Sequence, residues 1–269
     1  YWIRKAAEGG CTQAQAFLGS LYARGEHVPR DYEEAMRWFL KAAEQGNDDA
    51  RFNIGRMYLV GDGVTQDETT AMSWFDRVSK RQRHKCYWCH MGDLYSEGAR
   101  LPQNDEKALY WYTRSAEDGD DNAQLKLGLM YAEGARVPQN AEMAIKWFRN
   151  AAKQGDGIAF CHIGAMYENG IGVPQSYSKA LKYYDKADWH PKAMSQMGYL
   201  YATGLGVRRN YKRALRWYYA PKVAPEIEVQ RDRYELSEFC AASFYLNGLG
   251  VAQNDKEAFR WCRQAAEKG

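Results

Sequence analysis

The sequence predicts an all-α fold, a solenoid of stacked helix-turn-helix repeats. Three observations predict it. A glycine recurs about every 36 residues, aromatic and aliphatic residues keep a fixed distance from it, and a helix N-cap residue opens the second half of each unit. The 269 residues of the chain supply several such units, and since one unit cannot bury its apolar face alone, neighbouring units must stack.

The recurring glycine, called here the reference glycine, sets the repeat. The intervals are 36, 37, 36, 36, 34 and 44 residues, and alanine takes the seventh place. The reference positions are Gly19, Gly55, Gly92, Gly128, Gly164, Gly198 and Ala242. A glycine inside a helix costs about 1 kcal/mol relative to alanine. Its recurrence therefore indicates a close helix crossing, where we expect the alanine at position 16 after it, such as Ala35, to face it.

Each unit reads as two helices. The first ends near a glycine at position 6, such as Gly25, and the second begins after an N-cap residue at position 12. The predicted N-caps are Asp31, Asp67, Asn104, Asn140, Ser176, Asn210 and Asn254. A glycine at position 27, found at Gly46, Gly119, Gly155 and Gly269, fits a helix C′ residue.

Position 19 carries a large aromatic residue in every unit. These residues are Trp38, Trp74, Trp111, Trp147, Tyr183, Trp217 and Trp261. We expect them to fill the space between neighbouring hairpins, so that most of the tryptophan belongs to the core.

The units are predicted to form a single repeat domain over residues 1–269. Residues 1–10 are the end of a preceding repeat, and the repeats cover about 11–46, 47–83, 84–119, 120–155, 156–191, 192–233 and 234–269. About eight extra residues fall within 221–236, where Pro221 and Pro225 end the preceding helix. Because the chain starts halfway through a unit and neither end has an obvious polar capping helix, we expect it to be part of a longer protein.

The pattern A-x-x-x-L-G-x-x-Y-x-x-G-x-x-V-x-x-D/N-x-x-x-A-x-x-W-x-x-x-A-A-x-x-G resembles the Sel-1-like repeat. Residues 14–46 and 123–155 follow it well, and the resemblance covers essentially the whole chain. The resemblance implies a right-handed α/α superhelix with a concave face lined by first helices. It also implies adaptor or scaffold work, commonly in bacteria and often in exported or periplasmic proteins, although this chain leaves a cytoplasmic location open.

The function that this resemblance favours is a non-catalytic protein–protein interaction scaffold with its partner protein on the concave face. Bacterial members also include immunity proteins, so an immunity or inhibitor protein that neutralises a secreted toxin is the alternative. The residues assemble no nucleophile, base and orienting group, so no enzyme is expected. The net charge of +3 gives no reason to expect nucleic acid. No apolar run approaches the roughly 18 residues of a membrane helix, so no membrane insertion is expected.

If first helices line the concave face, positions 1, 4 and 5 after the reference glycine should point into it. The candidate partner-binding residues are Arg24, Arg56, Asp93, Glu97, Glu133, Glu168, Asn169, Tyr199, Thr203 and Asn247. Their charge runs from basic through acidic to neutral, a gradient that suits orienting an extended segment of a partner. Ordinary solvated helix surface is the alternative for each residue.

A basic patch of Arg208, Arg209, Lys212 and Arg213 surrounds the N-cap Asn210. Cations there oppose the helix dipole, since the N-terminal end of a helix carries partial positive charge. A solvated helix face is one interpretation, and an acidic ligand or partner is the other.

The cysteines suggest three further sites. Cys86, Cys89 and His90 have the spacing of a c-type haem attachment, and a zinc site would use Cys86 and Cys89 with His84 or His90. Because Cys89 falls in a predicted first helix, we favour an ordinary repeat residue and expect no cofactor. Cys240 and Cys262 are equally distant from Val251 along one hairpin, which makes them disulfide candidates.

Overall fold

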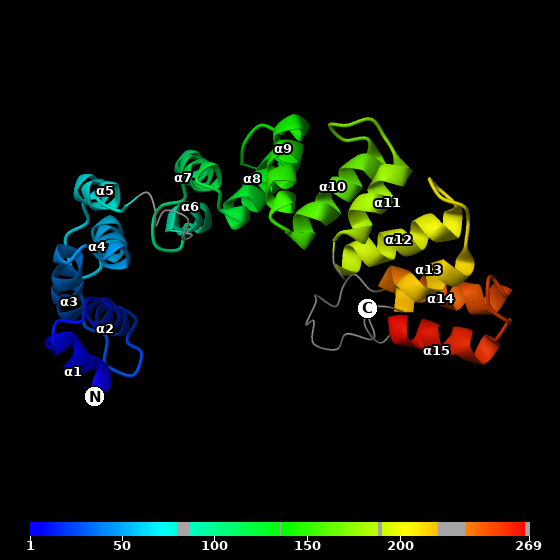
Figure 1. Ribbon diagram of the computed structural model, residues 1–269. Coiled ribbons are helices and arrows are strands. Elements are labelled where there is room, and N and C mark those ends of the chain that lie inside the picture. Colours follow the sequence, from blue (N-terminus) through cyan, green and yellow to red (C-terminus); the bar gives the residue numbers. More distant parts are fainter. Residues whose placement is uncertain (80–86, 135, 188–189, 220–234, 267–269) are drawn as a thin grey trace. The chain divides into compact units, whose positions relative to one another are not determined.

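The computed structural model of the chain describes residues 1–79, 87–134, 136–187, 190–219 and 235–266, without the side chains of residues 219, 235–240, 264 and 265. These residues form fifteen α-helices and no strand (Figure 1). The chain divides into two compact units, unit 1 (Tyr1–Asp120) and unit 2 (Asp121–Gly269). The all-α prediction is confirmed.

Both units consist of helix pairs. Unit 1 contains α1 (Trp2–Glu8), α2 (Thr12–Arg24), α3 (Tyr32–Glu44), α4 (Asp48–Val60), α5 (Glu68–Asp76), α6 (Tyr87–Glu97) and α7 (Asp105–Glu117). Unit 2 contains α8 (Asp121–Glu133), α9 (Ala141–Lys153), α10 (Gly157–Asn169), α11 (Tyr177–Asp185), α12 (Pro191–Thr203), α13 (Tyr211–Tyr219), α14 (Glu235–Asn247) and α15 (Asp255–Ala266).

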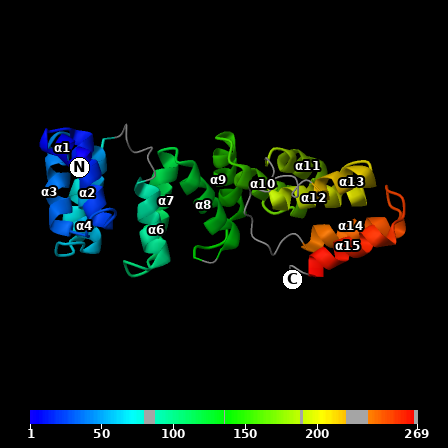
Figure 2. The same ribbon diagram turned by 90° about the horizontal axis from the view of Figure 1, so that it is seen from below.

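The even-numbered helices from α2 to α14 are first helices, and each packs most extensively against the second helix that follows it. Figure 2 shows α14 and α15 side by side in this arrangement. Second helices also contact the next first helix within a unit, as α3 does with α4 and α9 with α10. Stacking of hairpins thus buries a face that a single hairpin leaves open, as the repeat predicted.

The close helix crossing at the reference glycine is present, but its partner differs from the predicted one. A β-carbon added to any of the six reference glycines would lie 2.4–2.7 Å from a ring atom of the aromatic residue at position 20. These rings belong to Phe39, Phe75, Tyr112, Phe148, Tyr184 and Tyr218. The expected facing residue, the alanine at position 16, is buried, as with Ala35 and Ala144 at 0% exposure. Positions 16 and 20 lie one helical turn apart on the same face, and the larger side chain makes the contact.

The predicted N-caps are confirmed. All seven side chains accept a hydrogen bond from a backbone N–H in the first turn of a second helix, for example Asn104 from Lys107 at 2.9 Å and Asn210 from Arg213 at 2.9 Å. Gly46, Gly119 and Gly155 have positive φ just after a helix end, as a C′ glycine requires. Gly269 lies outside the described residues.

The position-19 aromatic residues pack as predicted. Trp111 is 3% exposed, stacks on Trp88 of its own first helix with ring centroids 5.3 Å apart, and meets Phe75 of the preceding hairpin edge-on. Trp38, Trp147 and Trp261 are also buried, and the remaining three are half-buried. Trp111 thus connects its hairpin to the preceding one.

Candidate binding surface

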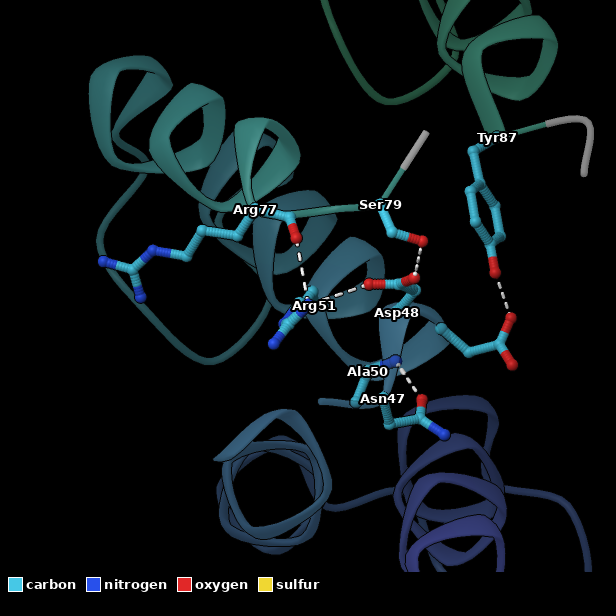
Figure 3. Close-up of polar contacts among 8 residues, drawn as sticks. Asn47, Asp48, Ala50, Arg51, Arg77, Ser79 and Tyr87 are labelled. Carbon is cyan, nitrogen blue, oxygen red and sulfur yellow. Dashed lines mark hydrogen bonds and ion pairs between the residues drawn. The ribbon is translucent and has the colours of Figure 1, made fainter. Parts of the chain in front are cut away.

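A group of polar contacts surrounds the N-terminal turn of α4 (Figure 3). Asp48 pairs with Arg51 at 2.9 Å and accepts a hydrogen bond from the Ser79 hydroxyl, while Arg51 also donates to the Arg77 carbonyl at 3.0 Å. The Tyr87 hydroxyl of α6 donates to Asp49 of α4. Of these contacts, the Tyr87–Asp49 hydrogen bond joins α6 to α4, whereas those of Ser79 and Arg77 join α4 to the segment after α5 in the same hairpin.

At the other end of α4 lies a cluster of charged side chains. Arg100, in the loop after α6, donates to Oδ1 of Asp62, in the loop after α4. Arg56 of α4 forms an ion pair with the second carboxylate oxygen at 3.9 Å. The Asp62 and Arg56 side chains are only 9% and 16% exposed, whereas that of Arg100 is 40% exposed.

The environment of Arg56 is unusual for an arginine. Burial lowers its pKa, the nearby Asp62 raises it, and repulsion from Arg100 and Arg24 lowers it further. Arg24, at the end of α2, is exposed and lies 3.4 Å from Glu26. The predicted binding residues Arg24 and Arg56 are therefore electrostatically coupled, while sequence reasoning missed Asp62 and Arg100.

Two of the acidic residues that were predicted to bind a partner form hydrogen bonds inside their own hairpins. Asp93 accepts a hydrogen bond from the Tyr112 hydroxyl at 2.6 Å, and Glu168 accepts one from Tyr184. Burial and then these hydrogen bonds raise the pKa of both tyrosines above the usual value. Both tyrosines stand at position 20, where three other hairpins have phenylalanine, so each carboxylate satisfies a hydroxyl that phenylalanine does not carry.

The other candidate residues of the first helices are exposed. They are Glu97 of α6, Glu133 of α8, Asn169 of α10, Tyr199 and Thr203 of α12, and Asn247 of α14. The last residue of α10 and that of α14 each donate a side-chain amide to the carbonyl one turn earlier, at 2.9 and 2.8 Å. The structure leaves these side chains accessible within each unit, and their role in binding stays a prediction.

A groove of about 720 Å³ lies between α1, α2 and α4. Its lining includes Trp2, Ile3 and Phe17, which are 75%, 39% and 48% exposed. Trp2 and Ile3 correspond to positions 19 and 20 of a hairpin, which elsewhere pack on the first helix of the same repeat.

The basic patch is exposed around the N-terminus of α13. Arg209 lies over the Tyr211 ring at 5.5 Å, and Arg213 over the Tyr201 ring at 5.6 Å. Among the described residues, none of the four cations forms an ion pair with a carboxylate. The four cations are therefore accessible, and an acidic ligand or partner for this patch stays a prediction.

The cysteine sites are described only in part. Cys89 is buried in α6 and His90 is exposed, while Cys86 and His84 lie outside the described residues. In the part of the chain that the structure describes, no three His, Cys, Asp or Glu side chains gather as metal ligands. Cys262 is an exposed free cysteine of α15, and the Cys240 side chain is not described, so the disulfide stays a prediction. None of the described helices is long and apolar enough to cross a membrane.

The family model of the Sel1 repeat matches residues 1–11, 12–47, 48–80, 89–120, 121–156, 161–187, 191–220 and 234–269. The chain belongs to the Sel1 repeat family. Sel1 repeat proteins are protein-interaction scaffolds and are generally non-catalytic.

Solved Sel1 repeat structures share this fold. A protective antigen of uropathogenic Escherichia coli strains is 33% identical with a TM-score of 0.74, and the match covers 100% of this chain. This chain spans 56% of the length of that antigen's chain. A Sel1 repeat protein from Oxalobacter formigenes is 32% identical with a TM-score of 0.67, over 99% of this chain and 75% of that one.

An immunity protein from Pseudomonas aeruginosa is 20% identical with a TM-score of 0.38, over 79% of this chain and 81% of that one. That likeness is too low to support the immunity alternative. No curated protein sequence matches the chain significantly.

Proposed function

We propose that this Sel1 repeat chain is a non-catalytic scaffold that holds a partner protein against the exposed face of its first helices. The observation that carries the proposal is a contrast between positions. Buried positions repeat the same residue types from hairpin to hairpin, as at the reference glycine and position 19. Position 5, which is exposed in every hairpin but the second, instead holds Arg24, Val60, Glu97, Glu133, Asn169, Thr203 and Asn247.

This contrast separates folding from recognition. A fold built from equivalent hairpins needs the buried residues to be equivalent, but it places no such demand on the exposed ones. A face that changes from hairpin to hairpin gives each part of a partner a different chemical surface to contact. No repeated constellation of nucleophile and base accompanies it.

The proposal is tested by site-specific photo-crosslinking in the native organism. A photoreactive amino acid replaces Glu97 or Glu133 on first helices, or the exposed Arg37 or Lys182 on second helices as matched controls. We expect a discrete crosslinked partner, identified by mass spectrometry, from the first-helix positions only. The purified partner should then form a stoichiometric complex with the chain.

Crosslinks from the second-helix controls alone would place the partner on the opposite face and refute the proposal. The absence of any discrete product from all four positions would also contradict it, provided that each variant accumulates and folds like the unmodified protein.

A further inference from the structure

The charged cluster of unit 1 contains more cations than its carboxylate can neutralise. The Asp62 carboxylate forms ion pairs with both Arg56 and Arg100, so one anion lies between two guanidinium groups. The nearby Arg24 pairs with Glu26 instead. Arg56, Arg100 and Asp62 together carry a net charge of +1, and the side chains of Arg56 and Asp62 are largely shielded from water.

The hydrogen-bonding capacity of this cluster is also unused. Among the described residues, the Arg56 guanidinium makes no hydrogen bond, since its approach to Asp62 at 3.9 Å exceeds hydrogen-bond distance. Oδ2 of Asp62 is buried and likewise accepts no hydrogen bond there. As far as the structure describes the chain, the N–H groups of Arg56 are therefore free to donate to a further acceptor.

The repeat itself does not require the cluster. Asp62 stands at position 7, where the five later hairpins carry Ala99, Ala135, Ile171, Leu205 and Leu249. Position 1, which Arg56 occupies, is acidic, aliphatic, aromatic or a serine in the other hairpins. Hairpins of the same fold therefore form without these charges, and their presence in unit 1 needs another cause.

We propose that Arg56 and Arg100 bind a carboxylate side chain in an acidic segment of the partner protein, with Asp62 orienting the two guanidinium groups. This inference rests on the proposed scaffold function and names the chemistry of the partner. The planar guanidinium groups present paired N–H donors that match a carboxylate. One carboxylate neutralises the net charge of +1, whereas a doubly charged phosphate would leave the site with a net charge of −1.

The binding is tested by titrating the intact chain and observing its arginine side-chain Nε–H signals by NMR. The probe is a blocked peptide of alternating glycine and glutamate, and the matched control peptide has glutamine in place of glutamate. Inorganic phosphate forms a third titration. We expect saturable shifts of the Arg56 and Arg100 signals with the glutamate peptide, weakened by added salt, and no saturation with the glutamine peptide.

Variants establish which residues bind. Arg56→Gln and Arg100→Gln should each lower the affinity for the glutamate peptide about tenfold or more, because each substitution removes charge-assisted hydrogen bonds to the peptide carboxylate. Arg37→Gln is the matched control, since its guanidinium is exposed on α3 and, within the described part of the chain, pairs only with Glu34. Arg100→Gln also guards against misfolding, because Arg100 is the more exposed member of the cluster.

Three results would overturn the inference: equal binding of the two peptides, phosphate binding tighter than the glutamate peptide, or unchanged affinity in both arginine variants with their fold intact. Each leaves the scaffold proposal standing if photo-crosslinking still captures a partner at Glu97 and Glu133. If photo-crosslinking captures no partner but the glutamate peptide still binds, the scaffold proposal fails while the carboxylate site stands.

Discussion

The ring of Tyr112 lies so close to Gly92 that a β-carbon on the glycine would come within 2.4 Å of two of its ring atoms. The same relation joins the reference glycine to the position-20 aromatic in six hairpins. In the seventh, both members change together: alanine stands at position 242 and cysteine at position 262. A larger residue on the first helix thus coincides with a smaller one on the second.

Gly92→Ala should destabilise the chain, since the overpacking costs about 1–3 kcal/mol while helix propensity returns about 1 kcal/mol. Denaturant unfolding measures the change. In a Tyr112→Ala background the ring is absent, so the same substitution should become stabilising. Failure of the sign to reverse would mean that the ring is not the cause.

Asp62→Asn should lower the free energy of unfolding by about 1–3 kcal/mol, because it leaves Arg56 and Arg100 partly buried without a counter-charge. Glu26→Gln is the control, since Glu26 is 50% exposed beside Arg24 and its loss should cost at most about 1 kcal/mol. Equal effects of the two substitutions in thermal or chemical unfolding would contradict the structural role of Asp62.

Stability should fall as the pH rises above the ordinary tyrosine pKa of 10.0. The pKa of Tyr112 and that of Tyr184 are raised in the folded state. Above this pH the unfolded chain therefore loses these protons first, and its free energy falls relative to that of the folded chain. Replacing both tyrosines by phenylalanine should flatten the alkaline decline. An unchanged slope in unfolding experiments between pH 9 and about 11 would refute the assignment.

Gln139→Arg should destabilise the fourth hairpin by about 1 kcal/mol, because Gln139 donates to the Ala132 carbonyl at 2.8 Å. Arginine occupies the same position in Arg30 and Arg209, where a tyrosine two residues later lies under the guanidinium. Adding Ala141→Tyr to Gln139→Arg should recover part of the loss. Strict additivity of the two changes in unfolding free energy would speak against this pairing.

The elements predicted from the sequence are those that local chemistry determines. Asn104 caps its helix because its side chain needs only the N–H groups of the next turn, so the sequence order alone indicates the contact. The predicted partner of the reference glycine, the alanine at position 16, was wrong. Ala108 and Tyr112 share one helix face, and spacing alone does not indicate which of the two side chains reaches the helix crossing.

The charged cluster could be predicted only in part for a different reason. Arg56 is marked by its place on a first helix, but its contacts depend on how two loops approach each other. Asp62 and Arg100 are 38 residues apart and belong to successive hairpins. A one-turn offset between hairpins, which no pattern within a repeat encodes, would separate them.

The steric fit of each reference glycine to its ring has a consequence for how such a chain can change over generations. The fit is completed inside one hairpin, so the exposed residues of the same first helix contribute little to it. Substitutions there should cost almost no stability. A lineage can therefore alter what the surface recognises without first acquiring a stabilising mutation elsewhere.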